Sequence, residues 1–299
     1  MQYRLLGNTN LQISAIGLGC WALGGGRDWG PTDFSAAQET VLAAWDAGIN
    51  LIDTAPIYGE SENTLGRILK GKRQQVILAT KCGLVKNGSW TDHDLRPQTI
   101  CTQLEQSLQN LRTDYVDLYF IHYLDPQIPW QEVLETLTRL QTQGKIRYIG
   151  VCNVPPKILS KMASTGLISC VQDELSYLHP AKGQAALEIC RKYHLGFISY
   201  GSLCGGILSG KYTQEPNLRR ADARNYFYKC YRGESFKQAQ AQVSHLQQKA
   251  AQHGLTPAQW ALGWVLTQPG VTCALAGART AAQITQNALA ADVAEDVCN

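Results

Sequence analysis

Short apolar runs alternate with amphipathic segments along almost the whole chain. An apolar run of about four to eight residues bounded by turn residues is typical of a buried strand, and apolar residues spaced about three and four apart are typical of a helix. The pattern predicts strands over residues 16–19, 49–52, 75–82, 116–123, 146–153, 170–175, 196–202 and 271–277. It predicts helices over residues 34–47, 62–69, 97–112, 130–143, 155–163, 184–194, 236–252, 257–267 and 281–291.

Local signals refine the two ends of this pattern. Residues 3–13 predict a β-hairpin whose turn is Asn8-Thr9-Asn10. Ser61 is expected to cap the helix over residues 62–69, because a hydroxyl oxygen can accept a hydrogen bond from a free amide of the first turn. The stretches expected to be irregular are residues 83–96 and residues 203–235.

The repeated strand-then-helix order predicts the fold class. Alternating β and α segments favour a parallel sheet, and eight such units in about 250 residues match the size of a (β/α)8 TIM barrel. A doubly wound open sheet is the alternative, but it needs a boundary or a change of pattern that the sequence lacks. The chain shows no linker, repeat or low-complexity stretch, so residues 1–299 are expected to form one TIM-barrel domain with an N-terminal hairpin.

Composition excludes several classes of function. The net charge is only +3 and no run of Lys or Arg is present, which argues against a nucleic-acid partner. No apolar stretch reaches the roughly 18 residues of a membrane span. The first residues do not read as a signal peptide, so a cytoplasmic protein with no membrane partner is expected. The sequence gives no indication of oligomeric state.

The ten cysteines are scattered and include no CxxC pair. Reduced, buried thiols are therefore expected rather than disulfides or a metal cluster. Cys20, Cys82, Cys152 and Cys204 follow predicted strand ends. Small packing residues explain them best, and redox sensitivity near the mouth of the fold is the alternative.

Polar side chains stand at or near the ends of six predicted strands: Asp53, Lys81, His122, Asn153, Gln172 and Tyr200. The carboxyl ends of parallel strands lie on one face of a barrel, where catalytic residues gather in this fold. A charge at the end of a buried strand is costly unless it is paired. Since neighbouring strands lie about 5 Å apart, Lys81 is the expected partner of Asp53.

Tyr58 lies five positions beyond Asp53, in a loop bounded by Pro56 and Gly59. A lysine beside a tyrosine favours the phenolate, so Lys81 is expected to lower the pKa of Tyr58. The phenol can then act as a general acid toward a carbonyl oxygen, with His122 hydrogen-bonded to the same oxygen. Each residue alone has a structural explanation, but their occurrence at successive strand ends favours catalysis.

Two motifs were weighed and rejected. Gly17-Leu-Gly-Cys-Trp-Ala22 fits the dinucleotide fingerprint G-x-G-x-x-A, which requires a helix to open at its end. Gly24-Gly25-Gly26 and Pro31 oppose a helix there. His122-x-x-Asp125 suggests metal ligands, but no third ligand lies at a recognisable spacing, so no metal is expected.

The constellation Asp53-x4-Tyr58, Lys81 and His122 resembles the Asp-Tyr-Lys-His tetrad of the aldo-keto reductase superfamily. The segments Asn50–Gly59 and Gly144–Asn153 are also similar to segments of that superfamily, in its bacterial type with a short C-terminal tail. The resemblance implies a TIM barrel that binds NADP(H) without a Rossmann domain and reversibly reduces a small-molecule carbonyl substrate. It further implies that the tyrosine donates the proton, that the lysine and aspartate tune it, and that the histidine orients the substrate.

The resemblance also implies a cofactor site. Asn153 and Gln172 correspond to the residues that bind the carboxamide, and Tyr200 to the aromatic ring that stacks on the nicotinamide. Cys152 stands where the family commonly has serine, and Gly277-Ala278 where some members have Lys-Ser. Arg279 is then the expected ligand of the 2′-phosphate. The full set of cofactor-binding candidates is Trp21, Asp53, Asn153, Gln172, Tyr200, Ser202, Leu203, Gly205, Lys211, Gly277, Arg279, Gln283 and Asn287.

The expected function is NADPH-dependent reduction of aldehydes or ketones. The substrate-binding candidates are Trp21, Tyr58, Trp90, His122 and Tyr123, with the tyrosines of residues 225–231 as weaker candidates. Two alternatives remain open. One is a regulatory subunit that binds NADP and senses redox state, and the other is a sugar or polyol dehydrogenase linked to NAD.

Overall fold

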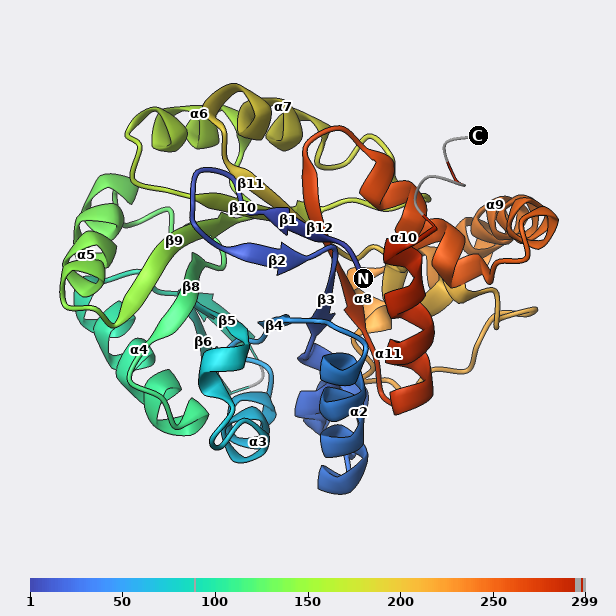
Figure 1. The fold of residues 1–299 in the computed structure, drawn as a ribbon, viewed down its shortest axis with the longest axis horizontal. Helices are drawn as coiled ribbons and strands as arrows, with labels where there is room; N and C mark the ends of the chain where they lie inside the picture. The colour runs from blue at the N-terminus through green and yellow to red at the C-terminus, as the bar shows by residue number, and fades with distance from the viewer. Residues whose placement is uncertain (89, 294–296, 298–299) are drawn as a thin grey trace.

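Eight parallel strands close into a barrel with helices around it (Figure 1). The computed structural model describes residues 1–88, 90–293 and 297. The barrel strands, in order around the ring, are β3 (Ile16–Gly19), β4 (Leu51–Asp53), β5 (Ile77–Cys82), β8 (Val116–Ile121), β9 (Ile146–Cys152), β10 (Cys170–Glu174), β11 (Gly196–Tyr200) and β12 (Val271–Gly277). β12 pairs with β3 and closes the ring, which confirms the predicted TIM barrel.

Helices follow the strands in the predicted order. They are α2 (Phe34–Asp46), α3 (Ser61–Ile68), α4 (Pro97–Leu111), α5 (Trp130–Thr142), α6 (Pro156–Ser164), α7 (Gln184–Tyr193), α9 (Gly233–Gln252), α10 (Pro257–Thr267) and α11 (Ala281–Ala288). Their starts are locally encoded, as α10 shows. Thr256 Oγ1 accepts from the Gln259 amide at 3.2 Å, and Gln259 Oε1 accepts from the Thr256 amide at 2.9 Å. This reciprocal pair satisfies two amides that the helix leaves free.

Two local expectations are corrected. Ser61 is the first residue of α3 rather than its cap, because its buried hydroxyl instead donates to the Cys20 carbonyl at 3.1 Å and accepts from Thr54 Oγ1 at 2.8 Å. The stretch after β5 is not a simple loop. It holds a second hairpin of β6 (Leu84–Asn87) and β7 (Trp90–His93). These two strands were not predicted because their residues are largely exposed and form no buried apolar run.

The segment over residues 203–235 is mostly irregular, as predicted, with three short helical pieces. They are η3 (Cys204–Ser209), α8 (Arg224–Phe227) and η4 (Lys229–Tyr231). The loop after β3 likewise holds only short turns, η1 (Trp21–Gly24) and α1 (Gly26–Trp29). No long helix opens after Gly19, as expected when the dinucleotide fingerprint was rejected.

Side chains inside the barrel form one core and those between barrel and helices form another. Along β8, Leu118 and Phe120 belong to the inner cluster, whereas Tyr119 and Ile121 belong to the outer one, as the alternation of a strand requires. Phe120 fills the space beside Gly150 so closely that a Cβ there would lie 2.3 Å from its ring. Only glycine fits at that position.

The predicted N-terminal hairpin is confirmed as β1 (Tyr3–Leu5) and β2 (Gln12–Ser14), an antiparallel pair. Figure 1 shows it lying across one end of the barrel. Leu6, Leu11 and Ile13 from this segment join the inner cluster. The hairpin therefore closes the amino-terminal end of the barrel and leaves the carboxyl end for the site.

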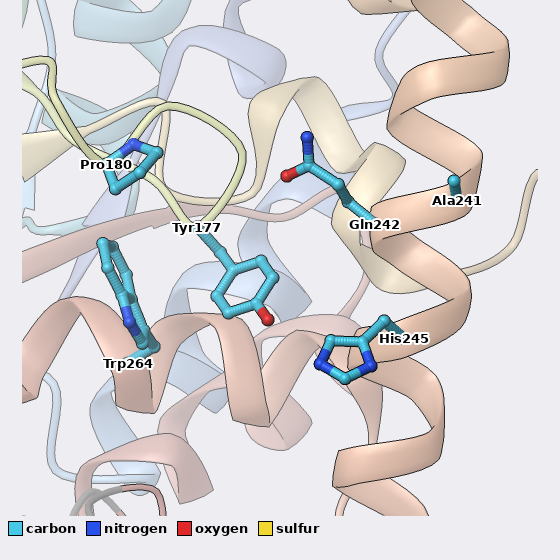
Figure 2. A pocket seen from close by; sticks show the side chains of 6 residues that line it. All are labelled: Tyr177, Pro180, Ala241, Gln242, His245 and Trp264. Atoms are coloured by element: carbon cyan, nitrogen blue, oxygen red, sulfur yellow. The ribbon is translucent and has the colours of Figure 1, made fainter.

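A surface hollow of about 480 Å³ lies outside the barrel (Figure 2). Gln242 and His245 of α9 face Trp264 of α10 and Tyr177, which follows β10. None of the predicted site residues lines it. This hollow is therefore separate from the polar strand ends.

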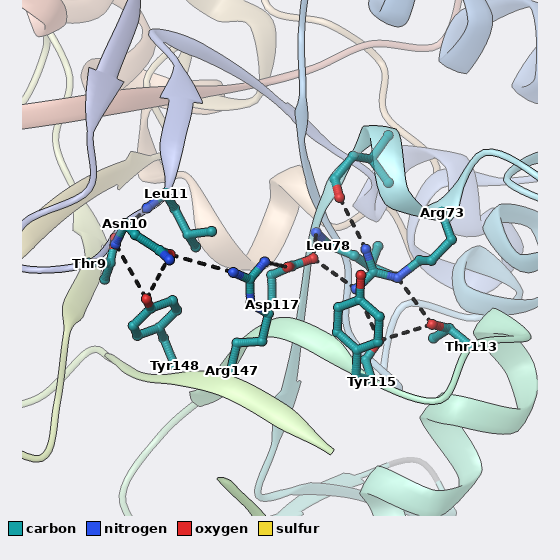
Figure 3. Close-up of polar contacts among 11 residues, drawn as sticks. Thr9, Asn10, Leu11, Arg73, Leu78, Thr113, Tyr115, Asp117, Arg147 and Tyr148 are labelled. Carbon is teal, nitrogen blue, oxygen red and sulfur yellow. Dashed lines mark hydrogen bonds and ion pairs between the residues drawn. The ribbon is translucent and has the colours of Figure 1, made fainter. Parts of the chain in front are cut away.

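A buried carboxylate organises the amino-terminal end of the barrel (Figure 3). Asp117, near the start of β8, is 1% exposed and accepts from Arg73 Nη2 at 2.8 Å, Arg147 Nη1 at 2.9 Å and the Leu78 amide at 2.9 Å. Arg147 Nη2 also donates to Asn10 Oδ1 at 3.4 Å, in the turn of the hairpin. One carboxylate thus links β5, β8 and β9 to the hairpin.

We expect Asp117→Ala to lower the free energy of unfolding by about 3 kcal/mol, because it leaves a buried amide and two guanidinium groups without their acceptor. Urea denaturation measures this loss. Asp114→Ala, which removes an exposed carboxylate three residues away, is the matched control and should cost less than about 0.5 kcal/mol. Equal losses of unfolding free energy in the two variants would show that the buried contacts of Asp117 stabilise the fold no more than an exposed carboxylate does.

Candidate active site

Asp53 and Lys81 form a buried ion pair at the carboxyl ends of β4 and β5. Lys81 Nζ lies 2.7 Å from Asp53 Oδ1, and it also donates to the Thr54 carbonyl at 2.9 Å. Lys81 is 0% exposed and Asp53 is 3% exposed. The predicted pairing is confirmed, and each charge offsets the desolvation of the other.

Gln172 completes the coordination of Asp53. It reaches from β10 across the barrel and donates from Nε2 to Asp53 Oδ2 at 2.8 Å. Its own Oε1 lies 3.8 Å from Cys152 Sγ. Both carboxylate oxygens of Asp53 are therefore held, which fixes the position of the Lys81 ammonium.

Tyr58 is placed by the loop after β4. Its amide donates to the Ala55 carbonyl at 3.0 Å, and the Glu60 amide donates to the Gly24 carbonyl at 3.1 Å. A Cβ on Gly24 would lie 1.6 Å from the Tyr58 carbonyl oxygen, so only glycine permits this approach. The Tyr58 ring centroid lies 5.0 Å from Lys81 Nζ and 5.9 Å from that of His122.

The pKa of Tyr58 differs from the expectation drawn from the sequence. Burial raises the pKa of Tyr58, and the opposing pull of Lys81 does not overcome it. The sequence-based expectation of a lowered pKa is therefore wrong for this protein without ligand, because it counted the lysine and neglected desolvation. The consequence is a phenol that keeps its proton at neutral pH.

The two neighbours of Tyr58 are shifted in opposite directions. Burial lowers the pKa of Lys81, but the electrostatic interactions with Asp53, Tyr58 and Cys152 and the hydrogen bond to Asp53 together outweigh it, so the pKa lies above its usual value. Burial and then the charge of Lys81 hold the pKa of His122 well below its usual value. At neutral pH the group thus presents an ammonium, a neutral phenol and a neutral imidazole.

Aromatic rings line the mouth around Tyr58. Trp21 stacks on Tyr58 with centroids 5.8 Å apart, and Phe227 meets Trp21 edge-on at 4.9 Å. Trp29 contacts the same Trp21 ring at 5.5 Å. Trp21 was predicted to lie here, whereas Phe227 and Trp29 were missed because their loops carry no periodic signal.

The opposite side of the mouth carries a second stack. Tyr123 lies parallel to His122 with centroids 5.5 Å apart, and His93 stacks on Tyr123 at 5.5 Å. Trp90 lies on the hairpin with 79% of its surface exposed, and within the described chain it takes part in none of these ring contacts. The structure therefore groups Trp21, Tyr123 and His122 with Tyr58 and sets Trp90 apart.

The residues predicted to hold the nicotinamide are joined to one another. Asn153 has a left-handed φ of 56° and donates from Nδ2 to the His122 carbonyl at 3.0 Å. Tyr200 donates from its hydroxyl to Asn153 Oδ1 at 2.6 Å. These contacts connect the candidate nicotinamide site with the strand end that carries His122.

The segment after β11 contains a tight turn with two glycines of left-handed φ, Gly205 and Gly206, which we call the glycine cradle. Ser202 bonds Ser199 at 2.8 Å, and Leu203 precedes η3. Gly205 and Gly206 have φ of 66° and 99°. A Cβ on Gly205 would lie 2.9 Å from the Tyr228 ring, so the cradle depends on glycine.

Cations lie along the predicted phosphate end. Lys211 Nζ is exposed and stands 4.9 Å from the Tyr212 ring centroid. Arg279 donates from Nη2 to the Pro31 carbonyl at 3.3 Å and is exposed. A glycine cradle followed by exposed cations fits a dinucleotide with its phosphates.

The predicted adenosine end opens at Gly277, the last residue of β12. Gln283 Oε1 accepts from the Arg279 amide at 2.8 Å, and Thr280 Oγ1 caps α11 by accepting from the Gln283 amide at 3.3 Å. Asn287 is 6% exposed on the same helix. Gln283 thus serves the start of the helix in this structure, and its role toward adenine stays a prediction.

The described residues contain no disulfide, no metal-binding cluster and no membrane-spanning helix. All nine cysteines there are free; eight are buried, including Cys20, Cys82, Cys152 and Cys204, and Cys298 lies outside that range. No group of three His, Cys, Asp or Glu residues there is placed to hold a metal ion. No helix in that part of the chain is long and apolar enough to cross a membrane.

Comparison with known proteins agrees with this geometry. The model of the Aldo/keto reductase family matches residues 15–296. The chain is 38% identical over 290 residues to Aldo-keto reductase YhdN of Bacillus subtilis (strain 168), covering 95% of this chain and 87% of that protein. It is 32% identical over 305 residues to the NADH-specific methylglyoxal reductase of Escherichia coli (strain K12), covering 96% and 93%.

A solved structure supports the same assignment. The glycerol dehydrogenase AKR11B4 from Gluconobacter oxydans superposes with a TM-score of 0.86 at 30% identity, covering 99% of this chain and 94% of that chain. Family match, relatives and fold agree over nearly the full length. The chain therefore belongs to the aldo/keto reductase family of oxidoreductases, which bind a nicotinamide cofactor and act on small carbonyl substrates.

Proposed function

We propose that this protein reduces aldehydes or ketones to alcohols with NADPH, using Tyr58 as the proton donor. The observation that carries the proposal is the 2.7 Å Lys81–Asp53 pair beside Tyr58, a half-buried tyrosine whose phenol keeps its proton. A reduced nicotinamide bound beside these residues would supply a hydride to the carbonyl carbon and would itself be left oxidised. The carbonyl oxygen then takes the phenolic proton, so that an alcohol and a phenolate result.

Each neighbour has a defined part in that proton transfer. Lys81 stabilises the phenolate as it forms, because a fixed ammonium in a water-poor site acts strongly on developing charge. Asp53 keeps Lys81 charged, and Gln172 holds Asp53 in place. His122, neutral at working pH, donates a hydrogen bond that orients the carbonyl oxygen.

The proposed cofactor contacts follow the order of the candidate site. Asn153 and Gln172 would bind the carboxamide, with Tyr200 against the ring. Ser202, Leu203, Gly205 and Lys211 would line the pyrophosphate. Gly277, Arg279, Gln283 and Asn287 would hold the adenosine end, and Trp21 and Tyr123 would contact the substrate.

A second candidate is an NAD-linked dehydrogenase of sugars or polyols. Two relatives favour it by name, since one is a glycerol dehydrogenase and another is an NADH-specific reductase. In that direction the phenolate form of Tyr58 would accept the proton of the alcohol, and the oxidised nicotinamide would take the hydride. The proposed preference for NADPH over NADH depends on Arg279.

A regulatory subunit that only binds NADP is a further alternative. Such a subunit would not need the complete tetrad of Asp53, Tyr58, Lys81 and His122.

We expect Tyr58→Phe to lower the rate of carbonyl reduction by about a hundredfold to ten-thousandfold, because a general acid contributes on that scale. The affinity for NADPH should be unchanged. The assay is NADPH oxidation with a panel of reactive aldehydes and ketones. Tyr3→Phe, which alters a half-exposed tyrosine of the hairpin, is the control. Equal rates for Tyr58→Phe and wild type would remove the proton donor from the mechanism.

We expect Arg279→Ala to raise the Kd of NADPH by about tenfold or more, because a charge-assisted contact to phosphate is lost. The Kd of NADH, which lacks the 2′-phosphate, should not change. Fluorescence titration of both cofactors measures the two constants. A preference for NADPH that survives the substitution would exclude Arg279 as its source.

His122 should make stability depend on pH. Its folded-state pKa is depressed, so the unfolded chain takes up the proton first as pH falls below about 6.5. Wild type should lose up to about 1.4 kcal/mol per pH unit from this group below that value. In His122→Gln this part of the loss should disappear, and above about pH 7.5 the pH slopes of wild type and variant should coincide. Identical slopes of unfolding free energy from pH 7 to 5 would contradict the assignment.

A further inference from the structure

The segment around α8 is fastened onto the loop that follows β3. The Ala223 amide donates to the Asp28 carbonyl at 2.9 Å, and Phe227 packs edge-on against Trp21 at 4.9 Å. Arg224 places its guanidinium carbon 5.5 Å from the centroid of Trp29. Three separate contacts therefore hold the two segments together beside the candidate site.

Two arginines meet the same short stretch of that loop. A Cβ on Gly30 would lie 2.9 Å from Arg219 Nη2, so the guanidinium rests directly on this glycine. Arg279 Nη2 donates to the carbonyl of the next residue, Pro31, at 3.3 Å. Two side chains sixty positions apart in sequence therefore contact adjacent residues of the same loop.

The guanidinium groups of Arg219 and Arg279 are both exposed and are not neutralised by a bound carboxylate in the described chain. Within the described chain, neither Arg219 nor Arg279 forms a salt bridge. Asp222 is the acidic residue closest to Arg219 in sequence. Its two carboxylate oxygens accept hydrogen bonds from Nη2 and Nε of Arg224 at 2.7 and 2.8 Å. The charge of Arg219 acts on Asp222, yet the two form no salt bridge in the described chain, so an anion would stabilise the exposed guanidinium groups of Arg219 and Arg279.

The donor geometry of a guanidinium and the position of Arg219 both favour a phosphate as the anion. A guanidinium presents parallel donors that match the oxygens of a phosphate. Arg279 is the proposed ligand of the adenosine end, and Lys211 and the Gly205 cradle precede Arg219 on the same segment. We propose that Arg219 is a second phosphate ligand, which binds a phosphate of the dinucleotide together with Arg279. This inference rests on the proposed function, because it requires that the protein bind a cofactor that carries phosphate groups.

The test is cofactor affinity measured by quenching of protein fluorescence, without substrate. Arg219→Ala is compared with Arg220→Ala, which removes the adjacent exposed guanidinium. We expect Arg219→Ala to raise the Kd of NADPH about tenfold and Arg220→Ala to leave it within twofold. If the Kd of NADH is unchanged, the ligand is the 2′-phosphate, and if it rises equally, the ligand is the pyrophosphate.

Arg219→Lys keeps a charge and should recover part of the lost affinity, which separates a phosphate contact from packing against Gly30. The proposal is overturned if Arg219→Ala binds both cofactors as Arg220→Ala does, or if Arg219→Lys is as weak as Arg219→Ala. Failure of the proposed function looks different. There, wild type would bind NADPH and reduce no carbonyl, while the effect of Arg219→Ala on Kd would remain measurable.

Discussion

The site depends on a lysine ammonium that is buried at the end of a barrel strand. Lys81 cannot stay charged there alone, and Asp53 at 2.7 Å makes its charge tolerable. Only a closed barrel places β4 beside β5 and lets Gln172 reach Asp53 from β10. The fold therefore fixes this one ion pair. In the proposed mechanism, the pair stabilises the phenolate that Tyr58 becomes once it has donated its proton.

The two ends of the barrel divide structure from chemistry. Asp117 near the start of β8 connects three strands and the hairpin, and His122 directly after the same strand faces Tyr58, the proposed proton donor. The hairpin fills the amino-terminal end with Leu6, Leu11 and Ile13. Stability and reactivity are thus built at opposite ends of the same strands, which is the arrangement that this barrel fold favours.

Much of this could be predicted from the sequence, because the signals were local. Apolar runs marked the barrel strands, and their polar ends marked Asp53, Lys81 and His122. Other features depend on balances or contacts that no local pattern encodes. The pKa of Tyr58 is set by desolvation against Lys81, and Ser61 bonds across to Cys20 instead of capping its helix. Phe227 and Arg219 reach the mouth only because an irregular segment folds back onto the loop after β3.

The central claim is that Tyr58 and Lys81 act as one unit, and a double-mutant cycle tests it most directly. The single-turnover rate of carbonyl reduction is measured for Tyr58→Phe, Lys81→Met and the double variant, each saturated with NADPH and checked for folding. Residues that act as a unit are strongly non-additive. The account predicts that the double variant is no slower than the slower single variant. Losses that multiply, or a Lys81→Met variant as fast as wild type, would contradict it.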